Sequence, residues 1–143
     1  MAGFFFFKGL LMIFTLIVHA SPIQNQAPET ALRYARSLLE AGHTLHRVFF
    51  YRDGVYNANA LASGSADDVS IPFEWRSLAQ EYQVDLVVCI AAAIRRGILD
   101  ANEARRYEKS QHNLAEGFEL SGLGQLIEAS ILSDRVITFG GRG

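Results

Sequence analysis

Short apolar segments alternate with amphipathic helical segments along this chain, and this alternation restricts the possible folds more than any other feature. Segments rich in β-branched and aromatic residues predict strands, whereas apolar residues at helical spacing predict helices. Strands that alternate with helices form a parallel sheet with helices on both faces. We therefore predict an α/β domain with strands over residues 12–18, 44–51, 84–92 and 134–140, helices over residues 28–43, 72–83, 92–97 and 122–133, and a further helix capped by Asp100.

The composition suits a single domain. The chain has 143 residues, half of them apolar, with 20% charged residues and a formal net charge of −2. This is enough apolar material for one core, and no repeat, linker or low-complexity segment divides the chain. The absence of a basic excess argues against direct nucleic-acid binding. Cys89 is the only cysteine, which excludes an intrachain disulfide.

The N-terminal sequence MAGFFFFKGLLMIFTLIVHASP permits two interpretations. As a secretory signal, it has one cation, an apolar run and small residues before a cleavage point after Ala20. As structure, residues 12–18 are a buried strand of a parallel sheet. Removing this strand would leave the first helix without a preceding strand, so we expect residues 12–143 to form one domain, in the cytoplasm and away from membranes. Residues 1–11 are then an extension, explained by a start codon assigned upstream of Met12.

The common motifs of enzyme active sites are missing from the sequence. It contains no phosphate-binding loop of the Walker type, no glycine-rich dinucleotide fingerprint after a strand, and no nucleophile elbow of the G-x-S-x-G type. The four histidines are scattered without the spacing of metal ligands, and surface or capping roles account for them.

Cys89 is the residue with the clearest chemical potential. It lies near the C-terminal end of a predicted strand, where parallel α/β sheets bind their ligands, and directly before a predicted helix that carries Arg95 and Arg96. A helix N-terminus and nearby cations favour a thiolate, which can act as a nucleophile or carry a persulfide. The alternative is that Cys89 is a small buried apolar residue and that the two arginines form a solvated helix face.

Three blocks of sequence, in this order and spacing, resemble the DsrE/TusD family of sulfurtransferases: VFFYRDGVYNANAL, VVCIAAAIRRG and GFELSGLGQLIEASILSDRVITFG. The resemblance extends from about Glu29 to Phe139, and more loosely back to Met12. It implies a DsrE-like fold of flavodoxin-like βα architecture. It also places Cys89 where the family carries its persulfide-bearing cysteine.

The resemblance further implies a sulfur relay. Family members of the TusD type assemble with TusB- and TusC-like subunits into a heterohexamer, accept sulfur from a TusA-like donor and pass it to a TusE-like acceptor. The sulfur ends as the 2-thio group of a wobble uridine in tRNA, without direct contact of this subunit with nucleic acid. No metal or organic cofactor is implied. Two other roles stay open: a DsrE-type subunit of a sulfur-oxidation complex, and a non-catalytic scaffold subunit.

Other residues have possible supporting roles near Cys89. Tyr56 and Asn57 lie in the RDGVYNAN segment, where they either shape the pocket or only pack the loop. The ELSGLGQL segment, with Gly122 and Gly124, either brings backbone close to Cys89 or only starts a helix. The HASPIQNQAP loop after the first strand departs from the resemblance, because the family has a glycine-containing loop at this place.

Overall fold

Residues 10–64 and 70–140 are described by the computed structural model, which contains a five-stranded, all-parallel sheet of order β4-β3-β2-β1-β5. The predicted α/β class with a parallel sheet is confirmed. The strands are β1 (Ile13–Val18), β2 (Thr44–Phe50), β3 (Asp85–Cys89), β4 (Phe118–Ser121) and β5 (Arg135–Phe139). The helices are α2 (Ala27–Glu40), the 3-10 helix η2 (Arg52–Ala58), α3 (Ile71–Tyr82), α4 (Ile90–Arg95), α5 (Ala101–Arg106) and α6 (Gly124–Leu132).

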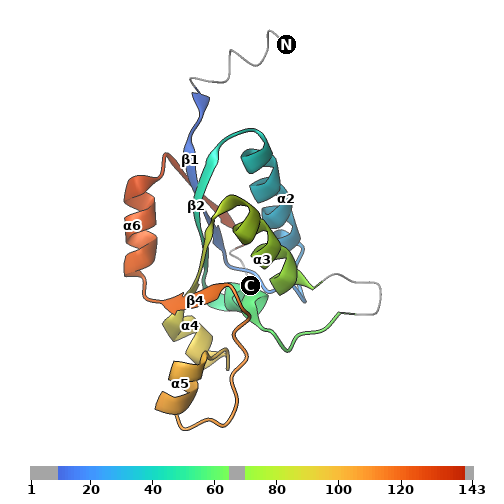
Figure 1. Cartoon of the computed structure of the whole chain (residues 1–143), viewed down its shortest axis with the longest axis vertical. Coiled ribbons are helices and arrows are strands. Elements are labelled where there is room, and N and C mark those ends of the chain that lie inside the picture. The colour runs from blue at the N-terminus through green and yellow to red at the C-terminus, as the bar shows by residue number, and fades with distance from the viewer. Residues whose placement is uncertain (1–9, 65–69, 141–143) are drawn as a thin grey trace.

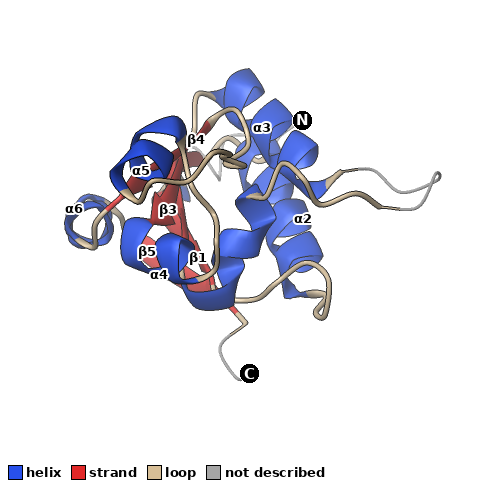
Figure 2. Cartoon of the chain, turned by 90° about the horizontal axis from the view of Figure 1, so that it is seen from below, coloured by secondary structure: helices blue, strands red, loops and turns tan. Residues whose placement is uncertain are grey.

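The helices form unequal layers around the sheet. Helices α2 and α3 cover one face, and α6 lies alone on the other (Figure 1). Seen from below, α4 and α5 lie across the end of the molecule toward which the strands run (Figure 2). This end holds the C-terminal edge of the parallel sheet, which is where the loops of such folds form binding sites.

The first predicted strand is confirmed as a central strand. β1 pairs with β2 on one side and with β5 on the other, so two ladders of backbone hydrogen bonds depend on it. Phe14, Leu16 and Val18 are buried on one face and Thr15 on the other, as expected for a strand covered on both faces. The apolar run that resembles a signal peptide is therefore an integral part of the core, while the predicted extension 1–11 lies mostly outside the described residues.

Helix α2 follows the predicted pattern closely. Five apolar side chains at helical spacing are buried against the sheet, and Pro28 lies in the first turn, where its missing N–H removes no helical hydrogen bond. Gly42 follows the helix with a φ of +92°, a conformation that glycine adopts readily. The buried apolar residues are Ala31, Leu32, Ala35, Leu38 and Leu39.

Three parts of the secondary structure differ from the predictions. The strand predicted to reach residue 92 ends at Cys89, because the alanine-rich segment that follows forms helix α4. The segment read as a polar loop after residue 51 begins with the 3-10 helix η2. Strand β4 was not predicted: it has four residues, two of them Glu119 and Ser121, and it lies at the edge of the sheet, where little burial marks it.

The apolar residues at helical spacing in the predicted helix are Leu123, Leu126, Ile127 and Ile131. Leu126 packs against the core, but the other three point to solvent. Leu123, just before the helix, and Ile127 and Ile131 within it are 46%, 62% and 78% exposed. We call these three residues the α6 apolar surface. Only Ala129 of the helix is buried. Within residues 10–64 and 70–140, no helix has the length and apolar character needed to cross a membrane.

Candidate functional site

Cys89 is the last residue of β3 and the N-cap residue of α4. Its backbone is extended (φ −61°, ψ 116°), which turns the chain directly from the strand into the helix. The side chain is only 3% exposed. The predicted position of Cys89 at the C-terminal edge of the sheet, directly before a helix, is thus confirmed.

A cleft of about 500 Å³ lies over Cys89. We call it the Cys89 cleft. Its walls come from four parts of the chain that the C-terminal ends of β2, β3 and β4 bring together: the start of η2, the end of β3, α4 and the turn before α6. The lining residues are Tyr51, Arg52, Cys89, Ile90, Ala91, Ala92, Arg95, Arg96, Gly122 and Leu123.

Arg96 links two walls of the cleft. Its Nε donates a hydrogen bond of 2.8 Å to Oδ1 of Asp53 in η2, and its Nη1 donates to the carbonyl of Ala92 in α4 at 3.1 Å. The guanidinium is therefore largely engaged by the protein itself. Arg95, its neighbour, is exposed and also lines the cleft. The structure brings both predicted arginines to Cys89, with different surroundings.

Arg52 also lines the cleft, from the start of η2, and its backbone is unusual. Its φ of +51° places a non-glycine residue in the left-handed region. The chain is held tightly here: the Tyr51 N–H donates to the Val18 carbonyl at 3.0 Å, and a Cβ on Gly54 would come within 1.8 Å of the same carbonyl oxygen. Only glycine fits at position 54, so η2 presses directly against the end of β1 and points Arg52 into the cleft.

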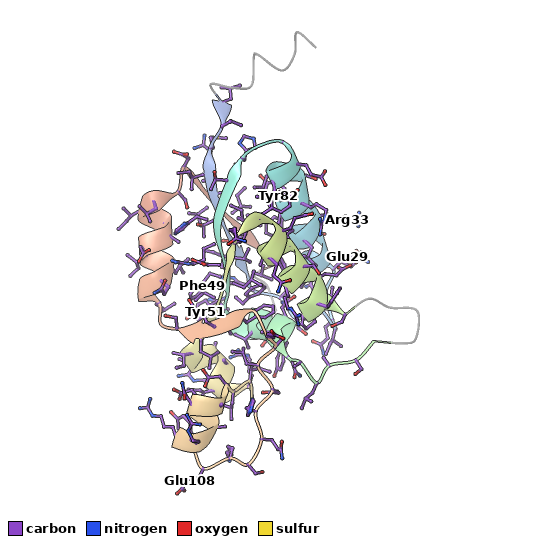
Figure 3. All side chains as sticks on the ribbon, in the orientation of Figure 1. Glu29, Arg33, Phe49, Tyr51, Tyr82 and Glu108 are labelled. Carbon is purple, nitrogen blue, oxygen red and sulfur yellow. The ribbon has the colours of Figure 1, made fainter. Side chains whose placement is uncertain are left out.

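His19 lies next to this turn, at the end of β1. Its ring packs edge-on against Tyr51 with a centroid distance of 5.8 Å, and its Nδ1 is buried without a hydrogen-bond partner among the described residues. Burial, and to a smaller extent the nearby Arg52 guanidinium, lower the pKa of His19 below its usual value of 6.5. Figure 3 shows Tyr51 beside Phe49 at the lower end of the sheet.

Tyr56 and Asn57 do not line the Cys89 cleft. Asn57 is fully buried, and its Nδ2 donates to the carbonyls of Ala20 at 3.0 Å and Gly54 at 2.8 Å. Its Oδ1 accepts a long 3.4 Å bond from the indole of Trp75. Asn57 thus ties the loop after β1 and helix α3 to η2, while Tyr56 packs half-buried against the core. Of the two roles considered for these residues, shaping the pocket or packing the loop, their positions agree with packing the loop.

The cleft also contains residues that the sequence did not single out. Tyr51 and Arg52 follow β2 directly, so the strand-end argument that selected Cys89 would also have selected them. Gly122 lines the cleft as expected, but Gly124 does not, and a Cβ at either glycine would meet nothing within 4 Å. No group of three or more metal-ligating side chains lies together within the described part of the chain.

Comparison with known proteins agrees with the fold and the position of this site. A model of the DsrE/DsrF-like family matches residues 12–139. The chain belongs to the DsrE/DsrF-like family. Its family relatives include the protein named putative sulfurtransferase DsrE of Allochromatium vinosum, which is 47% identical over 129 residues that cover 90% of this chain and 99% of that protein.

Another family relative, named sulfurtransferase TusD, comes from Sodalis glossinidius. It is 49% identical over 126 residues, covering 88% of this chain and 97% of that protein. Among solved structures, the YchN protein of E. coli superimposes with a TM-score of 0.71 at 20% identity, over 90% of this chain and all of that one. The YchN likeness shows the fold, and the names of the two family relatives support a sulfur-transfer role.

Proposed function

We propose that the protein accepts a sulfur atom on Cys89 as a persulfide and passes it to an acceptor thiol. The observation that carries this proposal is the position of the only cysteine of the chain, which lines a cleft at the C-terminal edge of the sheet among arginine side chains. A cysteine used only for packing has no need of such a cleft. The names of the family relatives agree with this chemistry.

The reaction needs one cysteine from this chain. The Cys89 thiolate attacks the outer sulfur of a donor persulfide; the new Sγ–S bond forms as the S–S bond of the donor breaks, and the donor leaves as a thiolate. An acceptor thiolate then attacks the outer sulfur of the Cys89 persulfide and regenerates the Cys89 thiolate. Electrons balance within each step, so neither a metal nor a redox cofactor is needed. In this scheme Arg95 and Arg96 line the cleft in which the sulfur is transferred.

We place this step in the relay that 2-thiolates wobble uridine in tRNA, in the cytoplasm. The donor is a TusA-like carrier, the acceptor is TusE-like, and the protein works in a heterohexamer with TusB- and TusC-like subunits. The exposed α6 apolar surface supports assembly with other subunits, because exposed apolar patches of this kind mark protein interfaces. The net charge of −2 fits a subunit that hands sulfur to proteins and does not bind RNA itself.

A second candidate is a subunit of a sulfur-oxidation complex. It is favoured by the similarity to DsrE of Allochromatium vinosum, which is nearly as high as that to TusD. The chemistry at Cys89 would be the same, and only the partners would differ. Restoration of 2-thiouridine in tRNA of cells that lack their own TusD subunit separates the two roles, because a sulfur-oxidation subunit would not restore it.

The mass of the purified protein after incubation with a persulfide donor tests the proposal. We expect a gain of one sulfur atom, lost again when an acceptor thiol is added, and no gain in Cys89→Ser. Since Cys89 is the only cysteine, no other thiol complicates the result. Arg33→Gln, which removes an exposed charge from α2, serves as the control and should gain sulfur normally.

Two results would contradict the proposal. If the wild-type protein gains no sulfur from any persulfide donor, Cys89 is not a carrier. If Cys89→Ser restores tRNA thiolation in cells as well as the wild type does, the protein is a scaffold subunit and Cys89 only packs. The first experiment measures the chemistry and the second measures its use in the cell.

A further inference from the structure

The lining of the Cys89 cleft is strongly biased in charge. Three of its residues are arginines, and none is acidic. The whole chain, in contrast, carries a formal net charge of −2. Asp53, a carboxylate of η2, forms an ion pair with Arg96 at 2.8 Å. The cleft therefore keeps the charge of Arg52 and Arg95 beside the cysteine.

Within residues 10–64 and 70–140, no partner accounts for the charge of these two arginines. Ion pairs occupy Arg96 and several surface arginines, but neither Arg52 nor Arg95 takes part in an ion pair or a side-chain hydrogen bond among the described residues. They line the cleft from two different elements, Arg52 from the start of η2 and Arg95 from α4. Arginine presents a fixed fork of donors that suits carboxylate, sulfonate and similar anions.

The backbone of Arg52 gives an independent indication. A left-handed conformation at a non-glycine residue costs free energy that glycine would avoid, and such strain is concentrated at functional positions. The fold requires the turn at this place, because η2 packs against the end of β1. The fold does not require an arginine there: the side chain is exposed and lines the cleft.

We infer that the group that brings sulfur to Cys89 is anionic, and that Arg52 and Arg95 bind it. The inference rests on the proposed sulfur acceptance at Cys89 and names the chemical class of the donor. The Cys89 thiolate and an anionic donor repel each other, and the departing group carries away a further electron pair. Two guanidinium groups that line the same cleft as the sulfur offset this repulsion and stabilise the departing anion.

The step balances for both kinds of small anionic donor. With thiosulfate, the Cys89 thiolate attacks the outer sulfur, the Sγ–S bond forms, the S–S bond breaks, and sulfite leaves with the electron pair. With the persulfide of a mercapto acid, the same bonds form and break, and the mercapto acid leaves as its thiolate. Neither reaction consumes an oxidant or a reductant.

The test uses two persulfide donors that differ mainly in charge: the persulfide of 3-mercaptopropionate, which has a carboxylate, and that of 2-mercaptoethanol, which is uncharged apart from its sulfur. The rate of sulfur gain on Cys89 is followed by intact mass. We expect the wild type to prefer the carboxylate donor by about tenfold, since hydrogen bonds to charged groups are worth this much. Added salt should reduce the preference.

The variants are Arg52→Gly and Arg95→Gln. Arg52→Gly relieves the left-handed strain, so it should fold with a midpoint of denaturation no lower than that of Arg33→Gln, the control. Each cleft variant should lose most of the preference for the carboxylate donor, measured as the ratio of the rates with the two donors and not as either rate alone. Arg52→Lys should recover part of the preference because it keeps the positive charge.

Equal slowing with both donors, or no charge preference in the wild type, would overturn the inference. Either result leaves the proposed function standing as long as Cys89 gains sulfur. A further pair of measurements identifies the source of the anion. Loading by thiosulfate that depends on Arg52 and Arg95 indicates a free sulfur oxyanion. If loading depends on these two arginines only with a persulfide-bearing carrier protein, the anion is an acidic group on that carrier. If loading depends on them with neither thiosulfate nor the carrier protein, the inference is wrong.

Discussion

Helices α2 and α6 show how one sequence pattern leads to two outcomes. Both have apolar residues at helical spacing, and both lie against the same sheet, on opposite faces (Figure 2). The apolar side chains of α2 are buried: Leu38, for example, is 5% exposed. Those of α6 face solvent, and Ile131 is 78% exposed. Periodicity thus predicts which residues share a face, but not what covers that face.

The two helices are also attached to the sheet differently. Helix α2 packs through apolar contacts. Helix α6 packs through Leu126 and the buried Ala129, and it has a polar attachment as well. The buried side chain of Arg47 in β2 donates to the carbonyl of Gln125 at 2.8 Å and lies 3.2 Å from Asp85 and 3.9 Å from Glu128. A polar attachment and an outward apolar face suit a helix that also binds another subunit, whereas α2 is part of the core.

The largest effect is expected for β1, the strand that supports both faces. A chain that starts at Ser21 lacks this central strand and should not fold, because both ladders that β1 makes with β2 and β5 are lost. A chain that starts at Met12 should unfold at the same denaturant concentration as the full chain. Circular dichroism with urea titration measures both. A folded chain from Ser21 would show that the N-terminal run is dispensable, as a signal peptide would be.

A core substitution in α2 comes next. Leu38→Ala removes a buried side chain and leaves a cavity, so the free energy of unfolding should fall by about 2–5 kcal/mol. Ile131→Ala in α6 is the matched control and should change it by less than about 0.5 kcal/mol. Urea denaturation of the isolated chain measures both values. Equal losses would mean that α6 is packed as tightly as α2 in solution.

Removal of the polar attachment should affect α6 selectively. Arg47→Ala leaves the Gln125 carbonyl and two carboxylates without their donor and should lower the free energy of unfolding by about 2 kcal/mol. Arg47→Met keeps the buried stem and should recover part of this loss. Hydrogen exchange should rise in α6 and not in α2. A uniform rise would show that Arg47 supports the whole sheet.

The α6 apolar surface itself should matter for assembly more than for folding. The double variant Ile127→Gln/Ile131→Gln keeps helix propensity while removing the apolar side chains, so the isolated chain should lose less than about 0.5 kcal/mol. Co-purification with TusB- and TusC-like subunits should fail, with Arg33→Gln on α2 as the control that still assembles. Intact assembly of the double variant would move the interface to another surface.

The sequence predicted much of the fold because burial leaves a strong pattern. β1 and β3 are nearly continuous apolar runs and β2 ends in one, since parallel strands in the middle of a sheet are covered on both faces. Strand β4 was missed because it is little buried. A four-residue edge strand that contains Glu119 and Ser121 has too few apolar residues to be recognised. The exposure of α6 could not be predicted, because it depends on what lies outside the chain.

For the site, the sequence identified Cys89 and its neighbours along the chain and missed Arg52. Cys89, Arg95 and Arg96 are close in sequence, so strand and helix boundaries were enough to bring them together. Arg52 reaches the same cleft from the end of another strand, β2, where the same strand-end argument could have found it, although its left-handed backbone has no signal in the sequence. Asn57 was noticed for its place in the RDGVYNAN segment, but its buried hydrogen bonds give it a packing role.

The smallest expected effect concerns pH, and it tests whether the two faces unfold together. Burial and Arg52 lower the pKa of His19 below 6.5, so the unfolded chain binds a proton that the folded chain resists. This contribution to stability is complete above the unfolded pKa and declines as the pH falls through 6.5 toward the lower folded pKa.

Between about pH 7.5 and 5.5 the free energy of unfolding should therefore decrease slightly in the wild type and less in His19→Gln. Arg52→Gly, which removes the positive charge near the ring, should also reduce the decrease. His19 follows β1 directly, and its backbone N–H donates to the carbonyl of Phe139 in β5. The loss of stability at lower pH should therefore raise hydrogen exchange in α2 and α6 alike. A pH effect confined to α6, or one that persists in His19→Gln, would mean that another group titrates and that the two faces open independently.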